Sequence, residues 1–310
     1  MTFQQWEWIT EEQFSSQDVA ELNLMAAVGL PGSEDLNVVT LLRKLDGWAK
    51  LVAVGTSNAM KCFHNREYRG VTPCRFRMMA LVTVVQRNLG VHYKLPFSEG
   101  EYDASDSRDL FLHGPLTGHG GTCATMPILY VAIGRRLGYP LKLVEAKQHL
   151  FCRWDEPNGS RFNIEATSPG FRDPPDEYYL ERPQPLTVAD LATGRYLKNL
   201  NARQEAALFL GERGNCALDN LDVSTALDAF DIAARLDSAK KSHANGVAVG
   251  LMVARILASR GNLERSDNFL QVSLPTPTEP WQHLALPAAR SHIERVLRNR
   301  ERRVREPPTT

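Results

Sequence analysis

The sequence predicts an α+β protein. Apolar residues recur at helical spacing through residues 1 to about 110, and again from 187 to about 300. Between them, segments 141–146, 149–154 and 161–167 have the character of short strands, and a turn containing Pro, Asn and Gly joins the last two. Helices that are separated in sequence from a run of strands are typical of α+β folds, whereas α/β folds alternate the two.

The same changes of pattern predict the domain organisation. The length of 310 residues suits about two or three domains. Proline-rich stretches at 169–175 and 183–185 indicate the exit from the strand-containing core. We expect four parts: a helical N-terminal region at 1–109, a core with a small antiparallel sheet at 110–185, a helical region at 186–300 and a disordered tail at 301–310.

Composition limits the partners and the compartment. Lys plus Arg equals Asp plus Glu at 36 each, so the formal net charge is zero, and no stretch interleaves aromatic with basic residues. We therefore expect neither a nucleic-acid nor a membrane partner. The first residues lack the pattern of a signal peptide, and the five cysteines are widely spaced with no Cys-x-x-Cys pair. The predicted location is the cytoplasm.

Two helices are predicted in the N-terminal region. The first is capped by Ser33-Glu34-Asp35 and carries apolar residues at helical spacing from Val38 to Val52. The second follows Pro73 and stops at Asn88-Leu89-Gly90. We expect their apolar faces to pack in a core rather than to form a binding groove.

A glycine-rich loop leads into an apolar helix. The loop residues Gly120-Gly121-Thr122-Cys123 precede this helix, which should end at Gly138. Because proline in a helix interior forfeits a hydrogen bond, Pro127 limits where the regular helix begins. We expect it to begin within residues 123–126, with Thr122 or Thr125 as the cap.

Cys123 would then lie at a helix N-terminus. The helix dipole and unpaired backbone N–H groups favour a thiolate there, and the thiolate is the nucleophilic form of cysteine. Cys123 is therefore a candidate nucleophile, although a buried cysteine that only fills space is the alternative. That alternative is the expectation for the remaining cysteines, Cys62, Cys74, Cys152 and Cys216.

A histidine and a glutamate follow on neighbouring strands. Because side chains alternate along a strand, His149 shares a face with Phe151 and Arg153, and Glu165 shares one with Asn163 and Thr167. The midpoint of positions 149 and 165 lies inside the turn, so a hairpin with a loop of about five residues would set them side by side. An acid beside an imidazole holds one ring nitrogen and favours the protonated ring.

Four segments together resemble bacterial transglutaminase-like proteins of the SirB1 type. They are Gly-Thr-Cys-Ala-Thr-Met-Pro-Ile-Leu-Tyr at 121–130, Arg-Arg-Leu-Gly-Tyr-Pro-Leu-Lys-Leu-Val at 135–144, His-Leu-Phe-Cys-Arg-Trp at 149–154 and Phe-Asn-Ile-Glu-Ala-Thr at 162–167. Those proteins resemble the transglutaminase and papain-like cysteine superfamily, whose triad runs Cys, His, Asp along the chain. The resemblance implies that Cys123 is the nucleophile, His149 the base and Glu165 the acid, with glutamate where aspartate is usual.

The implied reaction is attack of the Cys123 thiolate on an amide carbonyl of a protein or peptide, through a thioester that water or an amine resolves. The Cys123 N–H and a second donor would hold the oxyanion. His119 or His113 could supply that donor from the loop that also contains Gly121 and Thr122, or both histidines are simply polar loop residues. The reaction requires no cofactor and no metal.

Two other readings stay open. A zinc site built from His113, His119, Cys123 and His149 lacks a short ligand pair and leaves Glu165 without a role. The stronger rival is a non-enzymatic scaffold. Gly214, Ala226, Phe230 and Ala233 have the spacing of a tetratricopeptide helix pair, so the C-terminal helices could bind a protein partner around an inactive triad.

Overall fold

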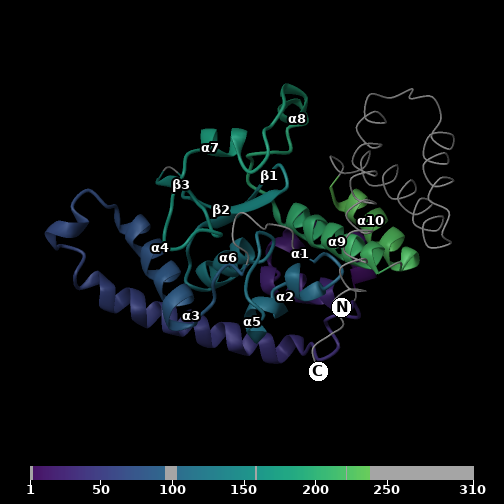
Figure 1. Cartoon of the computed structure of the whole chain (residues 1–310), viewed down its shortest axis with the longest axis horizontal. Coiled ribbons are helices and arrows are strands. Elements are labelled where there is room, and N and C mark those ends of the chain that lie inside the picture. The colour runs from purple at the N-terminus through teal and green to yellow at the C-terminus, as the bar shows by residue number, and fades with distance from the viewer. Residues whose placement is uncertain (1–2, 95–102, 158, 221, 238–310) are drawn as a thin grey trace, which may run out of the picture. The chain divides into compact units, whose positions relative to one another are not determined.

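The structure, a computed structural model, describes residues 3–94, 103–157, 159–220 and 222–237 (Figure 1). The chain divides into two compact units, 1–209 and 210–310. The first unit contains a small sheet and the candidate site. No helix in the described ranges combines the length and the apolar character that crossing a membrane requires.

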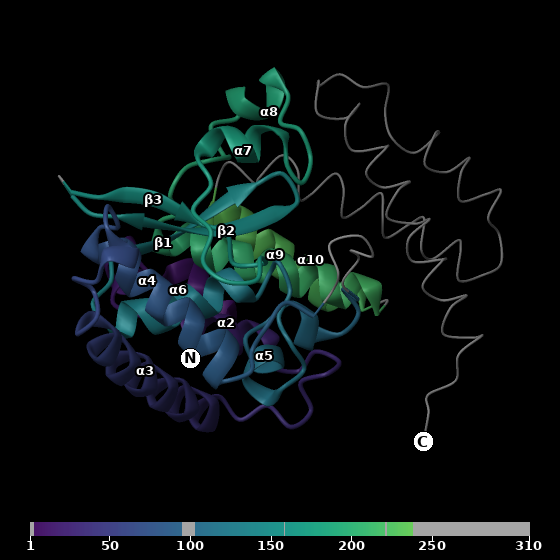
Figure 2. The same ribbon diagram turned by 60° about the vertical axis from the view of Figure 1, so that its left-hand side comes forward.

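Helices precede the sheet in the first unit (Figures 1 and 2). The α-helices are α1 (Glu11–Ser15), α2 (Val19–Ala27), α3 (Val38–Met60), α4 (Pro73–Thr83), α5 (His113–Thr117) and α6 (Met126–Arg136). Short 3-10 segments are η1 (Phe3–Trp8), η2 (Arg66–Tyr68) and η4 (Ser107–Asp109), and the π-helical turn η3 (Val84–Asn88) extends α4. Helix α6 is central, since every residue from Met126 to Gly134 is buried.

The helices predicted after residue 35, after Pro73 and before Gly138 are confirmed as α3, α4 and α6, but the predicted cap of α3 is wrong. The side chain of Asn37 accepts the N–H of Thr40 at 2.9 Å and caps the helix. Ser33 cannot cap α3, because it lies in the preceding turn and its hydroxyl donates to the carbonyl of Leu30 at 2.7 Å. The end of α6 agrees with the sequence: Gly138 follows it in the left-handed conformation, with φ of 73°.

Three antiparallel strands form the sheet in the order β1 (Leu141–Ala146), β2 (His149–Asp155) and β3 (Arg161–Ile164). The strand positions match the sequence prediction, except that β2 reaches Asp155 and β3 ends at Ile164 instead of reaching 167. The register pairs Cys152 with Ile164. Continuing that register would set position 149 opposite 167, so the expectation that it faces Glu165 directly is wrong by two residues. A shift of two keeps every side chain on its predicted face.

Helices cover the two faces of the sheet differently. On one face, α6 packs closely, and the Cys152 thiol donates to the carbonyl of Pro127 at 3.2 Å. Gly134 permits this approach, because a Cβ there would lie 2.3 Å from Leu141. On the other face, Tyr179 of α7 (Asp176–Glu181) stacks on Phe151, with centroids 3.8 Å apart.

The chain after α7 returns to the sheet. Past α8 (Val188–Ala192), the backbone N–H groups of Leu197 and Leu200 each donate to β1 at 2.9 Å. This segment covers the edge of β1 that β2 leaves free. Arg153, 1% exposed on the face of β2 that carries Phe151, donates to Leu197 and to Asp176 and so links both segments to the strand.

The second unit is described only to residue 237. Helix α9 (Ala202–Asp219) runs through the boundary between the units, and α10 (Val223–Leu236) follows. A Cβ at Gly214 would lie 2.5 Å from the ring of Phe230, so the two helices are in close contact at this predicted pair. The remainder of the predicted 186–300 region and the 301–310 tail lie outside the described residues. The tetratricopeptide assignment stays a prediction.

Candidate active site

Cys123 lies in the turn directly before α6, which begins at Met126 within the predicted window. Two threonines hold this turn. The hydroxyl of Thr122 accepts the N–H groups of Ala124 at 3.2 Å and Thr125 at 3.3 Å, and the hydroxyl of Thr125 accepts the N–H of Thr122 at 2.9 Å. Both predicted capping residues therefore satisfy amides in the turn that presents Cys123.

The backbone N–H of Cys123 differs from its neighbours. The amides of 122, 124, 125 and 126 are all hydrogen-bonded, whereas in the described ranges no acceptor is bonded to the N–H of Cys123. The cysteine is partly exposed and forms no disulfide. A thiol and an unused N–H donor thus come from the same residue, which is the arrangement that attack on a carbonyl requires.

His149, at the start of β2, is hydrogen-bonded to Glu165. Its Nε2 lies 2.9 Å from Oε2 of Glu165, and the two side chains are only 7% and 3% exposed. Since the register offsets the two positions by two residues, the contact is diagonal across the hairpin. Glu165 follows the last residue of β3, and its side chain has one more methylene than aspartate with which to cover the longer diagonal.

The pKa shifts of His149 and Glu165 favour an ion pair between the two side chains. Burial disfavours the charged imidazole, but hydrogen bonds and charge interactions with Cys123 and Glu165 raise the pKa of His149 from 6.5 to about 9. Burial likewise opposes the charge on Glu165, yet the hydrogen bond and charge of His149, with two hydrogen bonds from Thr167, lower the pKa of Glu165 below its usual range. At neutral pH, His149 is protonated and Glu165 is ionised.

Residues that the sequence did not indicate complete the acid's environment. Thr167 donates its N–H and its hydroxyl to Oε1 of Glu165, at 2.9 and 2.6 Å. The hydroxyl of Tyr179 donates to Oε2 at 3.2 Å, and its ring stacks on the imidazole of His149 with centroids 6.1 Å apart. Thr167 shares the predicted face of Glu165, but Tyr179 comes from a separate helix, so no sequence pattern could place it here.

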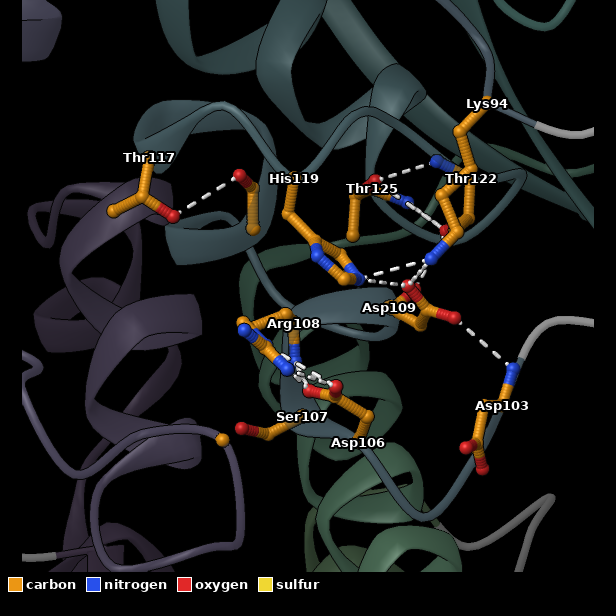
Figure 3. Close-up of polar contacts among 12 residues, drawn as sticks. Lys94, Asp103, Asp106, Ser107, Arg108, Asp109, Thr117, His119, Thr122 and Thr125 are labelled. Atoms are coloured by element: carbon orange, nitrogen blue, oxygen red, sulfur yellow. Dashed lines mark hydrogen bonds and ion pairs between the residues drawn. The ribbon is translucent and has the colours of Figure 1, made fainter. Parts of the chain in front are cut away.

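A polar cluster holds the loop that leads to Cys123 (Figure 3). Asp109, 2% exposed, is its centre: one carboxylate oxygen contacts both Lys94 and His119, and the other accepts the N–H of Asp103 at 3.0 Å. The carbonyl of Asp109 accepts the hydroxyl of Thr122 at 2.6 Å. Asp109 was not indicated by the sequence, because its partners are brought together only by folding.

The predicted oxyanion loop is only partly assembled around Cys123. Gly121 and Thr122 lie immediately before it, but Nε2 of His119 is engaged with Asp109 and Lys94 (Figure 3). His113 lies in α5, buried, with Nε2 near Ser107 and the carbonyl of Gly32, and burial lowers its pKa to about 4. The structure brings neither imidazole to Cys123 by a hydrogen bond. Within the described ranges, no group of three or more His, Cys, Asp or Glu residues could hold a metal ion.

The fold and the site define a class: an α+β core with a cysteine directly before a buried helix, and with a histidine on an antiparallel sheet that is hydrogen-bonded to an acid just after the last strand. Residues 43–177 match the transglutaminase-like superfamily, and the chain carries a domain of that superfamily over this range. Cys123, His149 and Glu165 all lie inside it. No curated protein and no solved structure matches the chain.

Proposed function

We propose that this protein is a cysteine-dependent enzyme that acts on an amide bond of a protein or peptide, with Cys123 as nucleophile, His149 as base and acid, and Glu165 as the orienting anion. One observation carries the proposal. The nearly sealed imidazole of His149 interacts with both Cys123 and Glu165, and together they raise its pKa to about 9. Such a histidine is protonated beside a thiol, as a thiolate–imidazolium pair requires.

Glu165 has one role in this scheme. Its Oε2 holds Nε2 of His149, which leaves Nδ1 as the ring nitrogen for the sulfur of Cys123. Its Oε1 is occupied by Thr167. Because both oxygens are held and the carboxyl pKa is lowered, Glu165 remains an anion and fixes the ring without taking the proton itself.

The chemistry follows in two steps. The thiolate of Cys123 attacks the amide carbon, a C–S bond forms, and the π electron pair moves to oxygen, where the N–H of Cys123 can donate to it. The imidazolium of His149 gives its proton to the amine, the C–N bond breaks, and a thioester remains. Neutral His149 then takes a proton from water or from an amine while its oxygen or nitrogen attacks the thioester carbon. The C–S bond breaks, the thiolate of Cys123 leaves with the bonding electrons, and the product is a carboxylic acid after hydrolysis or a new amide after acyl transfer.

The finer assignment rests on sequence. The segments that surround Cys123, His149 and Glu165 support placement with the SirB1 type, and the contact between Gly214 and Phe230 is compatible with one tetratricopeptide-like helix pair. We also propose a cytoplasmic location and a protein partner for the C-terminal helices. A catalytically inactive scaffold that binds such a partner is the rival function.

Selective alkylation separates the enzyme from the scaffold. Cys62 is an exposed free cysteine in the same chain and serves as an internal reference, while Cys74, Cys152 and Cys216 are buried. At pH 6.5 an ordinary exposed thiol is about 1% thiolate, so a thiolate at Cys123 should react with iodoacetamide tens of times faster than Cys62. Peptide mapping by mass spectrometry gives both rates. Equal labelling of the two cysteines would favour the inactive scaffold.

A further inference from the structure

A short segment far from Cys123 in sequence lies beside its loop. Residues 92–94 pair with Gly121 as a parallel bridge: the N–H of Gly121 donates to His92 at 3.0 Å, and the N–H of Lys94 donates to Gly121 at 2.9 Å. The side chain of Lys94 then contacts Asp109 and His119 (Figure 3). Backbone pairing and a charged cluster therefore fix this segment against the loop.

Tyr93, at the centre of that segment, is the bridge partner of Gly121. Side chains of paired residues point to the same side of a sheet. At Gly121 that side faces the start of α6, because a Cβ there would lie 2.2 Å from the sulfur of Met126. The geometry directs Tyr93 toward the helix N-terminus that carries Cys123.

The phenol of Tyr93 is near the site and is protonated. Burial, and the charges of Cys123 and Glu165, raise the pKa of Tyr93 to about 12, so the hydroxyl keeps its proton at neutral pH. The ring is half-buried, and no hydrogen bond occupies the hydroxyl among the residues that the structure describes. A free O–H donor thus lies within electrostatic range of the sulfur.

We propose that Tyr93 is the second oxyanion donor, acting with the N–H of Cys123 on the carbonyl oxygen of the substrate. Both predicted histidine donors are engaged elsewhere, His119 with Asp109 and His113 with Ser107. The proposal rests on the proposed function. When the thiolate adds to the carbonyl carbon, the π pair moves to oxygen and Tyr93 donates to the resulting oxyanion. When that electron pair re-forms the C=O bond, the leaving group departs with the electrons of its bond to carbon.

Two reagents separate oxyanion stabilisation from thiol reactivity. p-Nitrophenyl acetate acylates a cysteine through a tetrahedral oxyanion and releases p-nitrophenolate, whereas iodoacetamide alkylates it by displacement of iodide, without an oxyanion. Tyr93→Phe removes only the hydroxyl. We expect the acylation rate of Cys123 to fall about 100- to 1000-fold while its alkylation rate is unchanged. Tyr68→Phe, at a ring that packs on Phe76, is the matched control and should change neither rate.

Each other outcome overturns the proposal. Unchanged acylation in Tyr93→Phe would show that its hydroxyl does not touch the oxyanion. A parallel loss of both rates would assign Tyr93 to support of the thiolate or of the fold, which circular dichroism and urea unfolding would distinguish. If Cys123 of the unmodified chain reacts with neither reagent, the proposed function fails and the role of Tyr93 falls with it. If Cys123 is alkylated selectively but is acylated in Tyr93→Phe at the rate of the unmodified chain, only the proposed role of Tyr93 fails.

Discussion

Replacing Glu165 by glutamine should lower the pKa of His149 by an amount that the structure bounds. The pKa rises from 6.5 to about 9 although burial opposes the charge, so Cys123 and Glu165 together supply more than the net rise of about 2.5 pH units. If Cys123 and Glu165 contribute about equally to this rise, Glu165→Gln lowers the pKa of His149 by at least about 1.3 pH units, or roughly 2 kcal/mol, to a value below about 8. Glutamine keeps the size of the side chain, so the loss is one of charge.

The titration is measured by NMR. The chain has 8 histidines, and the imidazole signal of His149 is assigned by its loss in His149→Gln. Glu145→Gln is the matched control, because Glu145 is a carboxylate on β1 with a side chain 6% exposed that pairs with Arg195. It is not among the groups that shift His149, so its replacement should leave the pKa of His149 unchanged.

Two results would refute this reasoning. A pKa of His149 near 6.5 in the unmodified chain would mean that no anion stabilises the imidazolium. An unchanged pKa in Glu165→Gln would mean that Cys123 alone stabilises it, and the role of Glu165 as the orienting anion would be lost.

Three further predictions concern the same pair. The folded state binds the proton of His149 more tightly than the unfolded state, so this stabilisation is complete below pH 6.5 and is lost as the pH rises through about 9. In urea unfolding followed by tryptophan fluorescence, the free-energy difference between the unmodified chain and His149→Gln should therefore shrink by about 3 kcal/mol over that range, and a constant difference would contradict the raised pKa. In Glu165→Asp the side chain is too short for the diagonal contact with His149. Acylation of Cys123 by p-nitrophenyl acetate should therefore fall about tenfold or more, as expected when a positioned base is released. A rate equal to that of the unmodified chain would show that the extra methylene is not needed. Tyr179→Phe keeps the stack on Phe151 but removes the hydrogen bond to Glu165, which should cost about 1.5–3 kcal/mol of unfolding free energy, and no loss would show that the bond contributes little.

Local patterns in the sequence were sufficient to predict the elements around the site. Glycine and proline mark the limits of α6, and side-chain alternation places His149 and Glu165 on compatible faces. The exact register was not predictable from the midpoint of the turn, because a shift of two residues preserves the same faces. The backbone hydrogen bonds of the folded hairpin decide between the two registers.

Contacts between distant segments could not be read from the sequence. Asp109, Tyr93 and Tyr179 come from three different parts of the chain and have no common spacing. Their positions depend on the packing of the 92–94 segment against the loop and of α7 against the sheet. The prediction of the α3 cap was wrong for a local reason. Several residues near 33–37 can cap a helix, and because Ser33 lies in the preceding turn, Asn37 is the residue that caps α3.

Isolation of an acylated Cys123 tests the central claim most directly. Incubation with p-nitrophenyl acetate, followed by acid quenching and peptide mass spectrometry, should find one acetyl group on Cys123, with release of about one equivalent of p-nitrophenolate in the initial burst. Cys123→Ala should abolish the burst while the chain remains folded, and Cys62→Ala should leave it intact. A burst that survives in Cys123→Ala, or acetylation spread over several cysteines, would contradict the assignment of Cys123 as the nucleophile.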